Sequence, residues 1–173
     1  TNDVVPTAMK ITTLQLIDTL IETYQTYHKE MQKKAKEFED ILKVSRTHMQ
    51  DAVPVTLGQE FAAHASMINR DMKRLHAIKK ELYTVNIGGT AIGTGLTASQ
   101  TYIKQALYKL CEITGYNIVG ASNLIDSTQY PDVFIEVSAM LTVLAANQMK
   151  LMNDLRLMAS GPRAGLGEIT FEV

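Results

Sequence analysis

Residues 14–42 read LQLIDTLIETYQTYHKEMQKKAKEFEDIL, and their apolar positions recur at alternating steps of three and four residues without a break. This spacing places one apolar seam along a single helix and is typical of long bundle or coiled-coil helices. The seam consists of Leu14, Ile17, Ile21, Tyr24, His28, Met31, Ala35, Phe38 and Leu42. We expect a helix that begins near Thr7 and runs for about 38 residues, or roughly 57 Å. Such a helix needs equally long partners to cover its seam.

The partners are predicted further along the chain. Thr56 and Gln59 have the spacing of a capping box, which predicts a second long helix from there to about Val85. A shorter helix is expected over residues 98–114, with Gly115 as its C-terminal stop. The apolar stripe of the second helix is Phe61, Ala65, Ile68, Met72, Leu75 and Leu82, and that of the shorter helix is Ile103, Leu107, Leu110 and Ile113.

A third long helix is expected over residues 131–160, ended by Gly161-Pro162. It is apolar on several faces, as expected for a helix that is buried among neighbours. Its marker positions are Val133, Val137, Leu141, Leu144, Leu151, Leu155 and Met158. The sequence contains no credible strand pattern. The predicted fold class is therefore all-α, a long-helix bundle that occupies residues 1–173 as one domain.

Composition narrows the classes of function. The 173 residues carry 17 Lys and Arg against 18 Asp and Glu, a balance that does not predict a nucleic-acid-binding surface. The most apolar run, residues 133–146, is too short for a membrane span of about 20 residues, so we expect no membrane partner. The single Cys111 cannot form an intrachain disulfide and fits a reducing compartment, which predicts a cytoplasmic protein.

The best candidate for chemistry is the polar stretch 45–54, SRTHMQDAVP, which lies between two long helical patterns. Thr47 offers a hydroxyl, and His48 is the side-chain type that gains or loses a proton near neutrality. Pro54 pushes Val53 toward an extended conformation, so we expect a stiff, non-helical arm. The alternative is an ordinary helix-linking loop whose side chains bond to their own backbone.

Other polar features have weaker functional interpretations. His28 is expected to be a packing or interface residue, and His64 and His76 have no metal-ligand spacing to each other. The glycine-rich run 86–95 lacks the preceding strand of a βαβ unit that a dinucleotide-binding motif needs. It is either a helix breaker or a loop that another chain or a small anion approaches closely. Arg163 could bind a carboxylate or tie down a helix terminus. We expect no metal and no cofactor.

Four blocks of this sequence resemble the aspartase/fumarase superfamily, in the same order and at similar spacing. They are TNDVVPT at 1–7, RTHMQDAVPVTLGQEF at 46–61, GGTAIGTG at 88–95 and NDLRLMASGPRAGL at 153–166. Ser45 departs from the pattern, because the superfamily usually has Gly there. The resemblance implies the central helical domain of a longer enzyme. It also implies a homotetramer in which long helices from four subunits form one core bundle.

The resemblance further implies a reversible anti elimination from a four-carbon dicarboxylate that releases fumarate. Carried over to this sequence, Thr1 would bind a substrate carboxylate, and Asn2 and Thr47 would contact the leaving amino group or its neighbourhood. His48 would hold or polarise the substrate, with proton transfer as its second possibility. The serine that acts as general base would lie on a Gly-Ser-Ser loop beyond Val173. The 173-residue chain alone is therefore expected to be inactive.

The choice of substrate rests on few positions. The opening Thr1-Asn2-Asp3, Leu157 and Ala164 favour L-aspartate, which would be deaminated to fumarate and ammonia. Gly88-Gly89 resembles fumarases equally, so hydration of fumarate to L-malate is the alternative. A non-catalytic helical scaffold is the competing hypothesis from another class. It explains the helical seams but not the family-like blocks in the loops.

Overall fold

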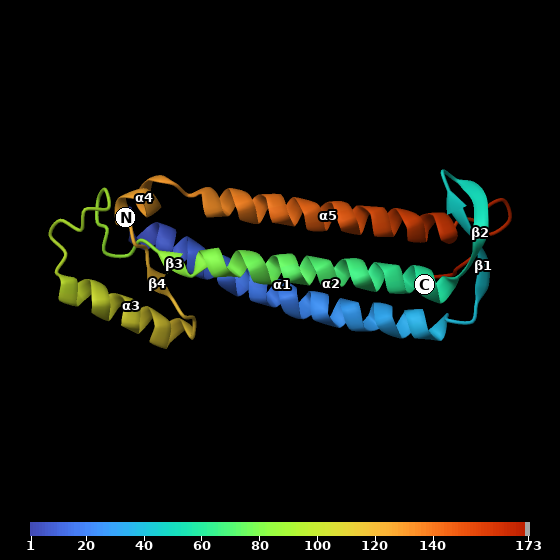
Figure 1. Cartoon of the computed structure of the whole chain (residues 1–173), viewed down its shortest axis with the longest axis horizontal. Coiled ribbons are helices and arrows are strands. Elements are labelled where there is room, and N and C mark those ends of the chain that lie inside the picture. Colours follow the sequence, from blue (N-terminus) through green and yellow to red (C-terminus); the bar gives the residue numbers. More distant parts are fainter. Residues whose placement is uncertain (172–173) are drawn as a thin grey trace. The chain divides into compact units, whose positions relative to one another are not determined.

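The computed structural model describes residues 1–171 and is built mainly of long helices (Figure 1). The elements in chain order are α1 (Val4–Glu37), β1 (Leu42–Thr47), β2 (Gln50–Thr56), α2 (Leu57–Leu82), β3 (Thr84–Val85), α3 (Gln100–Thr114), β4 (Val119–Gly120), α4 (Leu124–Gln129) and α5 (Asp132–Met158). The predicted fold class, a bundle of long helices, is confirmed. The expectation that the chain contains no strand is wrong, because two small two-stranded sheets are present among the described residues.

Helix α1 follows the predicted seam closely. Leu14, Ile17, Ile21 and Tyr24 are buried, and the later seam positions up to Phe38 are half-buried, whereas Leu42 is exposed. The helix ends at Glu37, so Phe38 lies in a turn and Leu42 opens β1. By length and composition α1 could also cross a membrane, with a window of mean hydropathy 1.2, but a core helix passes the same test.

The end of α1 is set by a contact distant in sequence. The backbone N–H groups of Leu57 and Gly58, at the start of α2, donate to the carbonyls of Ile41 and Phe38 at 2.8 and 2.9 Å. A Cβ on Gly58 would lie 2.4 Å from the carbonyl oxygen of Ala35, so only glycine allows this approach. These tertiary bonds override the apolar spacing that predicts helix as far as Leu42.

Two compact units divide the chain, and the long helices contribute to both. The first unit comprises residues 1–27 and 72–138 and contains α3, α4 and the parallel pair of β3 with β4. Its core consists of Leu14, Ile17, Ile21, Tyr24, Leu75, Ile78, Leu82, Val85, Ile87, Ile118, Val133 and Val137. Ser99 caps the start of α3, and Gly115, with a left-handed φ of 72°, ends it as predicted.

The second unit comprises residues 28–71 and 139–173, of which the structure describes those up to 171. It contains the antiparallel hairpin of β1 and β2. The predicted capping box at the start of α2 is confirmed: the N–H of Thr56 donates to Gln59 Oε1 at 3.0 Å, and the N–H of Gln59 donates to Thr56 Oγ1 at 3.2 Å. The core consists of Leu57, Phe61, Ala65, Ile68, Met140, Leu144, Leu151, Leu155 and Met158.

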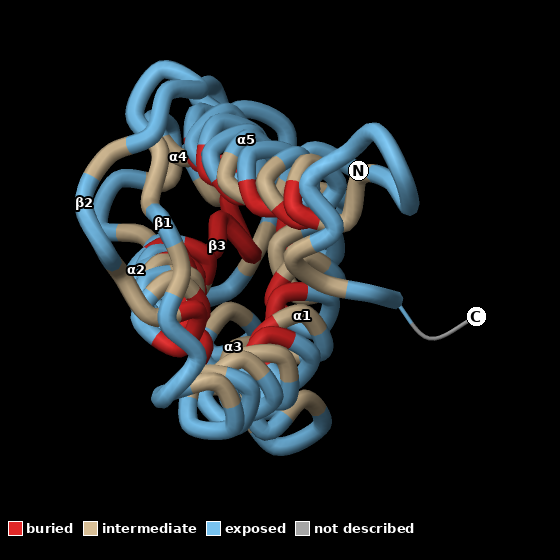
Figure 2. The backbone as a smooth tube through the Cα atoms, turned by 90° about the vertical axis from the view of Figure 1, so that its right-hand side faces the viewer, coloured by how far each residue is buried: buried red, intermediate tan, exposed pale blue. Residues whose placement is uncertain are grey.

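Burial follows the predicted stripes of the long helices, with two exceptions. Figure 2 shows the buried positions of α1, α2 and α5 on their inner sides and exposed positions on their outer sides. Ile113 on α3 and Leu141 on α5 were expected in the stripes, yet they are 78% and 43% exposed. In this single chain their apolar surface has no cover among the described residues.

Candidate functional site

The polar stretch 45–54 forms the tip of the β1–β2 hairpin. Thr47 pairs with Gln50, so His48 and Met49 are the two central residues of a two-residue turn. Both have positive φ, 50° and 64°, as a type I′ turn requires. Asn-Gly is the usual sequence for such a turn, and a histidine-methionine pair adopts it with strain. The predicted non-helical arm is confirmed, and it exposes Thr47 and His48 to solvent.

Ser45 interrupts the hairpin register. The pairing shifts between Val44 and Arg46, which leaves Ser45 in a bulge. Its hydroxyl donates to the carbonyl of Val53 on the opposite strand at 2.5 Å. The bulge therefore accommodates a serine where the superfamily usually has glycine.

An ionic cluster fixes the base of this hairpin. Lys43 Nζ contacts Glu60 at 2.8 Å and Glu168 at 2.9 Å, and Arg46 Nη2 contacts Glu168 at 2.6 Å. Burial alone raises the pKa of Glu168, but the hydrogen bonds from Arg46 and Lys43 outweigh it and leave the pKa below its usual value. Burial alone lowers the pKa of Lys43, and its two carboxylate partners reverse this. The pKa shifts of Lys43, Arg46 and Glu168 all favour the charged form of each side chain.

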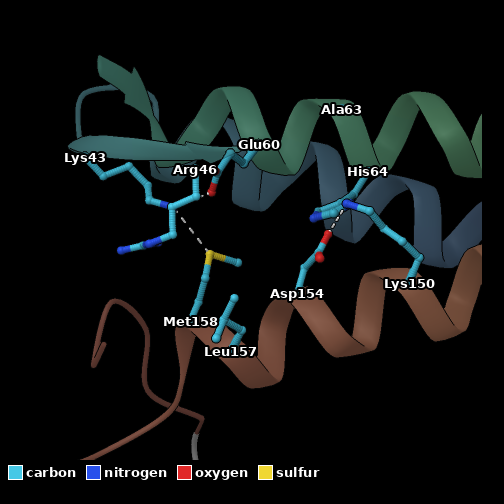
Figure 3. A pocket seen from close by; sticks show the side chains of 9 residues that line it. All are labelled: Lys43, Arg46, Glu60, Ala63, His64, Lys150, Asp154, Leu157 and Met158. Carbon is cyan, nitrogen blue, oxygen red and sulfur yellow. Dashed lines mark hydrogen bonds and ion pairs between the residues drawn. The ribbon is translucent and has the colours of Figure 1, made fainter. Parts of the chain in front are cut away.

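A cavity of about 240 Å³ lies beside this cluster (Figure 3). Its polar walls are Lys43 and Arg46 from β1, Glu60 and His64 from α2, and Lys150 and Asp154 from α5. Burial lowers the pKa of His64, and the nearby Asp154 offsets this only in part. Lys150 pairs with Asp154. Because the cations that line the cavity already have carboxylate partners, the cavity has little attraction for a further anion.

A second group of predicted residues lies at the start of α1. Asn2 Nδ2 donates to the carbonyl oxygen of Ala91 at 2.6 Å. Thr1, Asn2 and Asp3 line a cavity of about 350 Å³ together with Thr90 and Ala91 of the glycine-rich loop. Asn2 Oδ1 has no partner among residues 1–171, so the amide keeps an acceptor for a ligand.

In the glycine-rich loop 86–95, several backbone amides donate hydrogen bonds to other groups of this chain. A Cβ on Gly93 would lie 2.4 Å from the backbone of Ile125. The backbone of the loop therefore lies close to α4 at this position. The N–H groups of Gly88 and Thr90 donate to the carboxylate of Asp3. The N–H groups of Gly89, Gly93 and Gly95 donate to carbonyls within the loop. These amides are already engaged and are not free to donate to a phosphate.

Other candidates from the sequence lie apart from these groups. Arg163 is exposed and makes no hydrogen bond or ion pair with the described residues, and the end of α5 is held by Ser160 instead. His28 and His64 are half-buried and His76 is exposed. Across residues 1–171 no group of three or more His, Cys, Asp or Glu could hold a metal ion. The expected serine beyond Val173 lies outside the described residues.

The four predicted substrate-binding residues belong to different units. Thr1 and Asn2 lie in the first compact unit, whereas Thr47 and His48 lie in the second. Neither unit by itself brings the two pairs together. The ion pair of Lys43 with Glu168 at the base of the hairpin could not be predicted from the sequence, because partners 125 residues apart leave no local pattern.

Comparison with known proteins decides the family. A family model described as lyase matches residues 1–173, the whole chain. The chain belongs to the lyase family. This confirms the resemblance to the aspartase/fumarase superfamily and makes the chain a lyase domain.

Individual members of the lyase family are also similar. Aspartate ammonia-lyase from Bacillus subtilis (strain 168) is 52% identical over 170 residues, which are 98% of this chain and 36% of that protein. The solved structure of fumarate lyase:delta crystallin from Brucella melitensis bound to cobalt has a TM-score of 0.93 and 40% identity, over 98% of this chain and 37% of that chain. Class II fumarase from Schistosoma mansoni has a TM-score of 0.88 and 27% identity, over 95% of this chain and 38% of that chain.

The chain thus spans about a third of the length of the lyases that it matches. The matches cover both groups of predicted residues. The hairpin tip and the start of α1 therefore belong to a domain that lyases of this family share.

Proposed function

We propose that the full-length protein containing this chain catalyses the reversible deamination of L-aspartate to fumarate and ammonia. The observation that carries the proposal is the 52% identity to an aspartate ammonia-lyase, against 27% to a class II fumarase. Both fractions refer to nearly the whole chain, so they compare the same helices and loops.

The proposed chemistry is an anti elimination. A base removes a weakly acidic proton beside a carboxylate, which creates an enediolate-like dianion that needs preorganised donors. Thr1 and Thr47 offer hydroxyls, and His48 offers an imidazole on an exposed turn. Asn2 offers an amide whose orientation is fixed by Ala91. In this proposal Thr1 binds a substrate carboxylate, Asn2 and Thr47 contact the leaving group, and His48 polarises the substrate.

We further propose that copies of the chain assemble into a homotetramer. One feature supports this. Large apolar side chains remain exposed on the helices, including Leu16, Ile113 and Ile135 at 66%, 78% and 71%. Surfaces of this kind commonly mark association faces.

The test measures the formation of fumarate by its ultraviolet absorbance. L-aspartate and L-malate are offered in parallel to the full-length protein. Turnover of L-aspartate alone supports the proposal. His48→Ala should lower this turnover, whereas His76→Ala, which changes another exposed histidine, should not. The 173-residue chain should show no turnover on its own, because the expected serine base lies beyond it.

The second candidate is a fumarate hydratase. The observation in its favour is the TM-score of 0.88 to a class II fumarase, which has the same fold. Turnover of L-malate alone would replace our proposal with this candidate. Turnover of neither compound would favour the non-catalytic scaffold.

A further inference from the structure

Asp3 connects the start of α1 to the glycine-rich loop. Its carboxylate is buried, with 9% of the residue exposed. Oδ1 accepts a hydrogen bond from the N–H of Val4 at 2.8 Å. Oδ2 accepts from the N–H groups of Gly88 and Thr90 at 3.2 and 3.3 Å. One side chain therefore binds the first amide of α1 and two amides about 85 residues further along the chain.

The bond to Thr90 falls on a strained residue. Thr90 has a φ of 59°, in the left-handed region that β-branched residues avoid. A residue in that conformation persists only where its surroundings hold it. Here the carboxylate of Asp3 holds the N–H of Thr90, and the next residue, Ala91, directs its carbonyl at Asn2 Nδ2. The orientation of the Asn2 amide thus depends on the conformation of Thr90.

Asn86 fixes the backbone of Asn2. It is 1% exposed, and its Nδ2 donates to the carbonyl of Asn2 at 2.9 Å and to Thr128 Oγ1 at 3.0 Å. Asn2 is consequently held at its main chain by Asn86 and at its side chain by Ala91. The only freedom left to the amide is the rotation that the Ala91 carbonyl restrains.

We propose that Asp3 is a positioning residue for Asn2. Its carboxylate holds residues 88–90 in the conformation that directs Ala91 at the amide, and so determines which Asn2 atoms face the substrate. Both oxygens of Asp3 accept hydrogen bonds from backbone amides, so its proposed role is to position Asn2. This inference rests on the proposed function, because it assigns Asn2 to the substrate site.

The first test is Asp3→Ser in the full-length protein. Serine is also well tolerated at a helix N-terminus, so the start of α1 should be preserved. A single short hydroxyl cannot reach both loop amides, so the loop loses its anchor. We expect kcat for L-aspartate to fall about ten- to hundredfold, the range that a misplaced binding group produces. KM should change by less than about threefold, since Thr1 and the other proposed contacts remain.

The second test is rescue. Glycine adopts a left-handed φ without steric strain, so Thr90→Gly should restore the loop in the Asp3→Ser background. We expect the double variant to recover most of the lost kcat. A helix-capping role for Asp3 could not be rescued at Thr90. The matched control is Ser99→Ala, which removes the cap that Ser99 Oγ provides to the N–H of Tyr102 in the same unit. It should lower stability and leave kcat unchanged.

The outcomes separate the alternatives. Wild-type kcat in Asp3→Ser, or a loss that Thr90→Gly does not restore, would overturn the inference. If Asp3→Ser does not fold, Asp3→Asn replaces it in the same comparison, because asparagine also caps helices but loses one acceptor oxygen.

Amide hydrogen exchange provides a readout that does not depend on turnover. If the wild-type protein acts on neither L-aspartate nor L-malate, the proposed function fails, and exchange at Gly88 and Thr90 then tests the anchor. Faster exchange of both amides in Asp3→Ser supports the inference, and unchanged exchange overturns it.

Discussion

Asn147 on α5 donates its side-chain N–H groups to both carboxylate oxygens of Asp71 on α2, at 2.9 and 3.1 Å. Asp71 is fully buried in an otherwise apolar stripe. Hydrogen bonds to a buried carboxylate contribute more than neutral ones, because water cannot replace them. This pair therefore fixes the register of the two helices within the second unit.

Asn147→Ala should lower the free energy of unfolding by about 1–3 kcal/mol, since it removes these hydrogen bonds from a buried polar side chain. Urea denaturation of the two proteins would measure the difference. Asn153→Ala is the matched control, because Asn153 is exposed on the same helix. It should change stability by less than about 0.5 kcal/mol. Equal effects of the two substitutions would contradict a role for the Asp71–Asn147 pair.

The strained turn at the hairpin tip predicts opposite effects on stability and activity. Replacing His48 and Met49 by Asn-Gly should stabilise the protein by about 1–2 kcal/mol, because this pair adopts positive φ readily. The same change should reduce turnover of L-aspartate at least about a hundredfold through loss of the His48 imidazole. Thermal unfolding and the fumarate assay would measure the two effects.

Met49→Gly alone separates strain from chemistry. It should stabilise the turn and keep turnover within about threefold of wild type, because it leaves His48 in place. A double variant that is both less stable and fully active would refute the functional interpretation of the turn.

Glu168 should make the protein sensitive to acid. Its pKa lies below the usual 4.5 because hydrogen bonds from Arg46 and Lys43 outweigh the effect of burial. A carboxylate with a lowered pKa stabilises the folded state above its unfolded pKa, and this contribution is lost as pH falls through the folded value. We therefore expect stability to decrease below about pH 5.

Glu168→Gln removes the titrating group and tests this assignment. The variant should lose about 1–2 kcal/mol at pH 7, between the values typical of exposed and buried ion pairs. Its stability should then decline less steeply than that of wild type between about pH 5 and pH 3. Denaturation midpoints measured across this range would show parallel curves if Glu168 were not responsible.

The Tyr116 hydroxyl should lose its proton only at high pH. Burial, together with its hydrogen bond to Asp18 at 2.7 Å, raises the pKa of Tyr116 from 10.0 to about 12. Because the folded state holds this proton more tightly, its contribution to stability is complete below about pH 10 and is lost as pH rises toward 12. Tyrosinate absorbance should show this transition, and Tyr116→Phe should remove it. Asp18→Asn should shift it to lower pH, and no shift would exclude the Asp18 bond as a cause.

Features set by neighbouring residues were predictable from the sequence. The seam of α1, the capping box of Thr56 and Gln59, and the stop at Gly115 depend on contacts within a few residues. The hairpin was not predicted, because Leu42 continues the helical seam and Ser45 breaks the alternation of β1. Pro54 also argues against a strand, but it is tolerated in β2, since each strand of a two-stranded sheet has a free edge.

The site was predictable only in part. Thr1, Asn2, Thr47 and His48 were identified through the family resemblance, and their joint role in a site stays a prediction. The supporting contacts had no sequence signal. Asp3 binds Gly88 and Thr90 across a separation of 85 residues or more, so nothing in its own neighbourhood reveals that role.

The two backbone bonds from Leu57 and Gly58 to Ile41 and Phe38 close the base of the hairpin beneath its strands. The helices are thus joined before the chain makes its excursion through residues 42–56. The hairpin therefore leaves the helical framework and returns to it at one point, so a change of length at its tip would leave the junction of α1 and α2 intact.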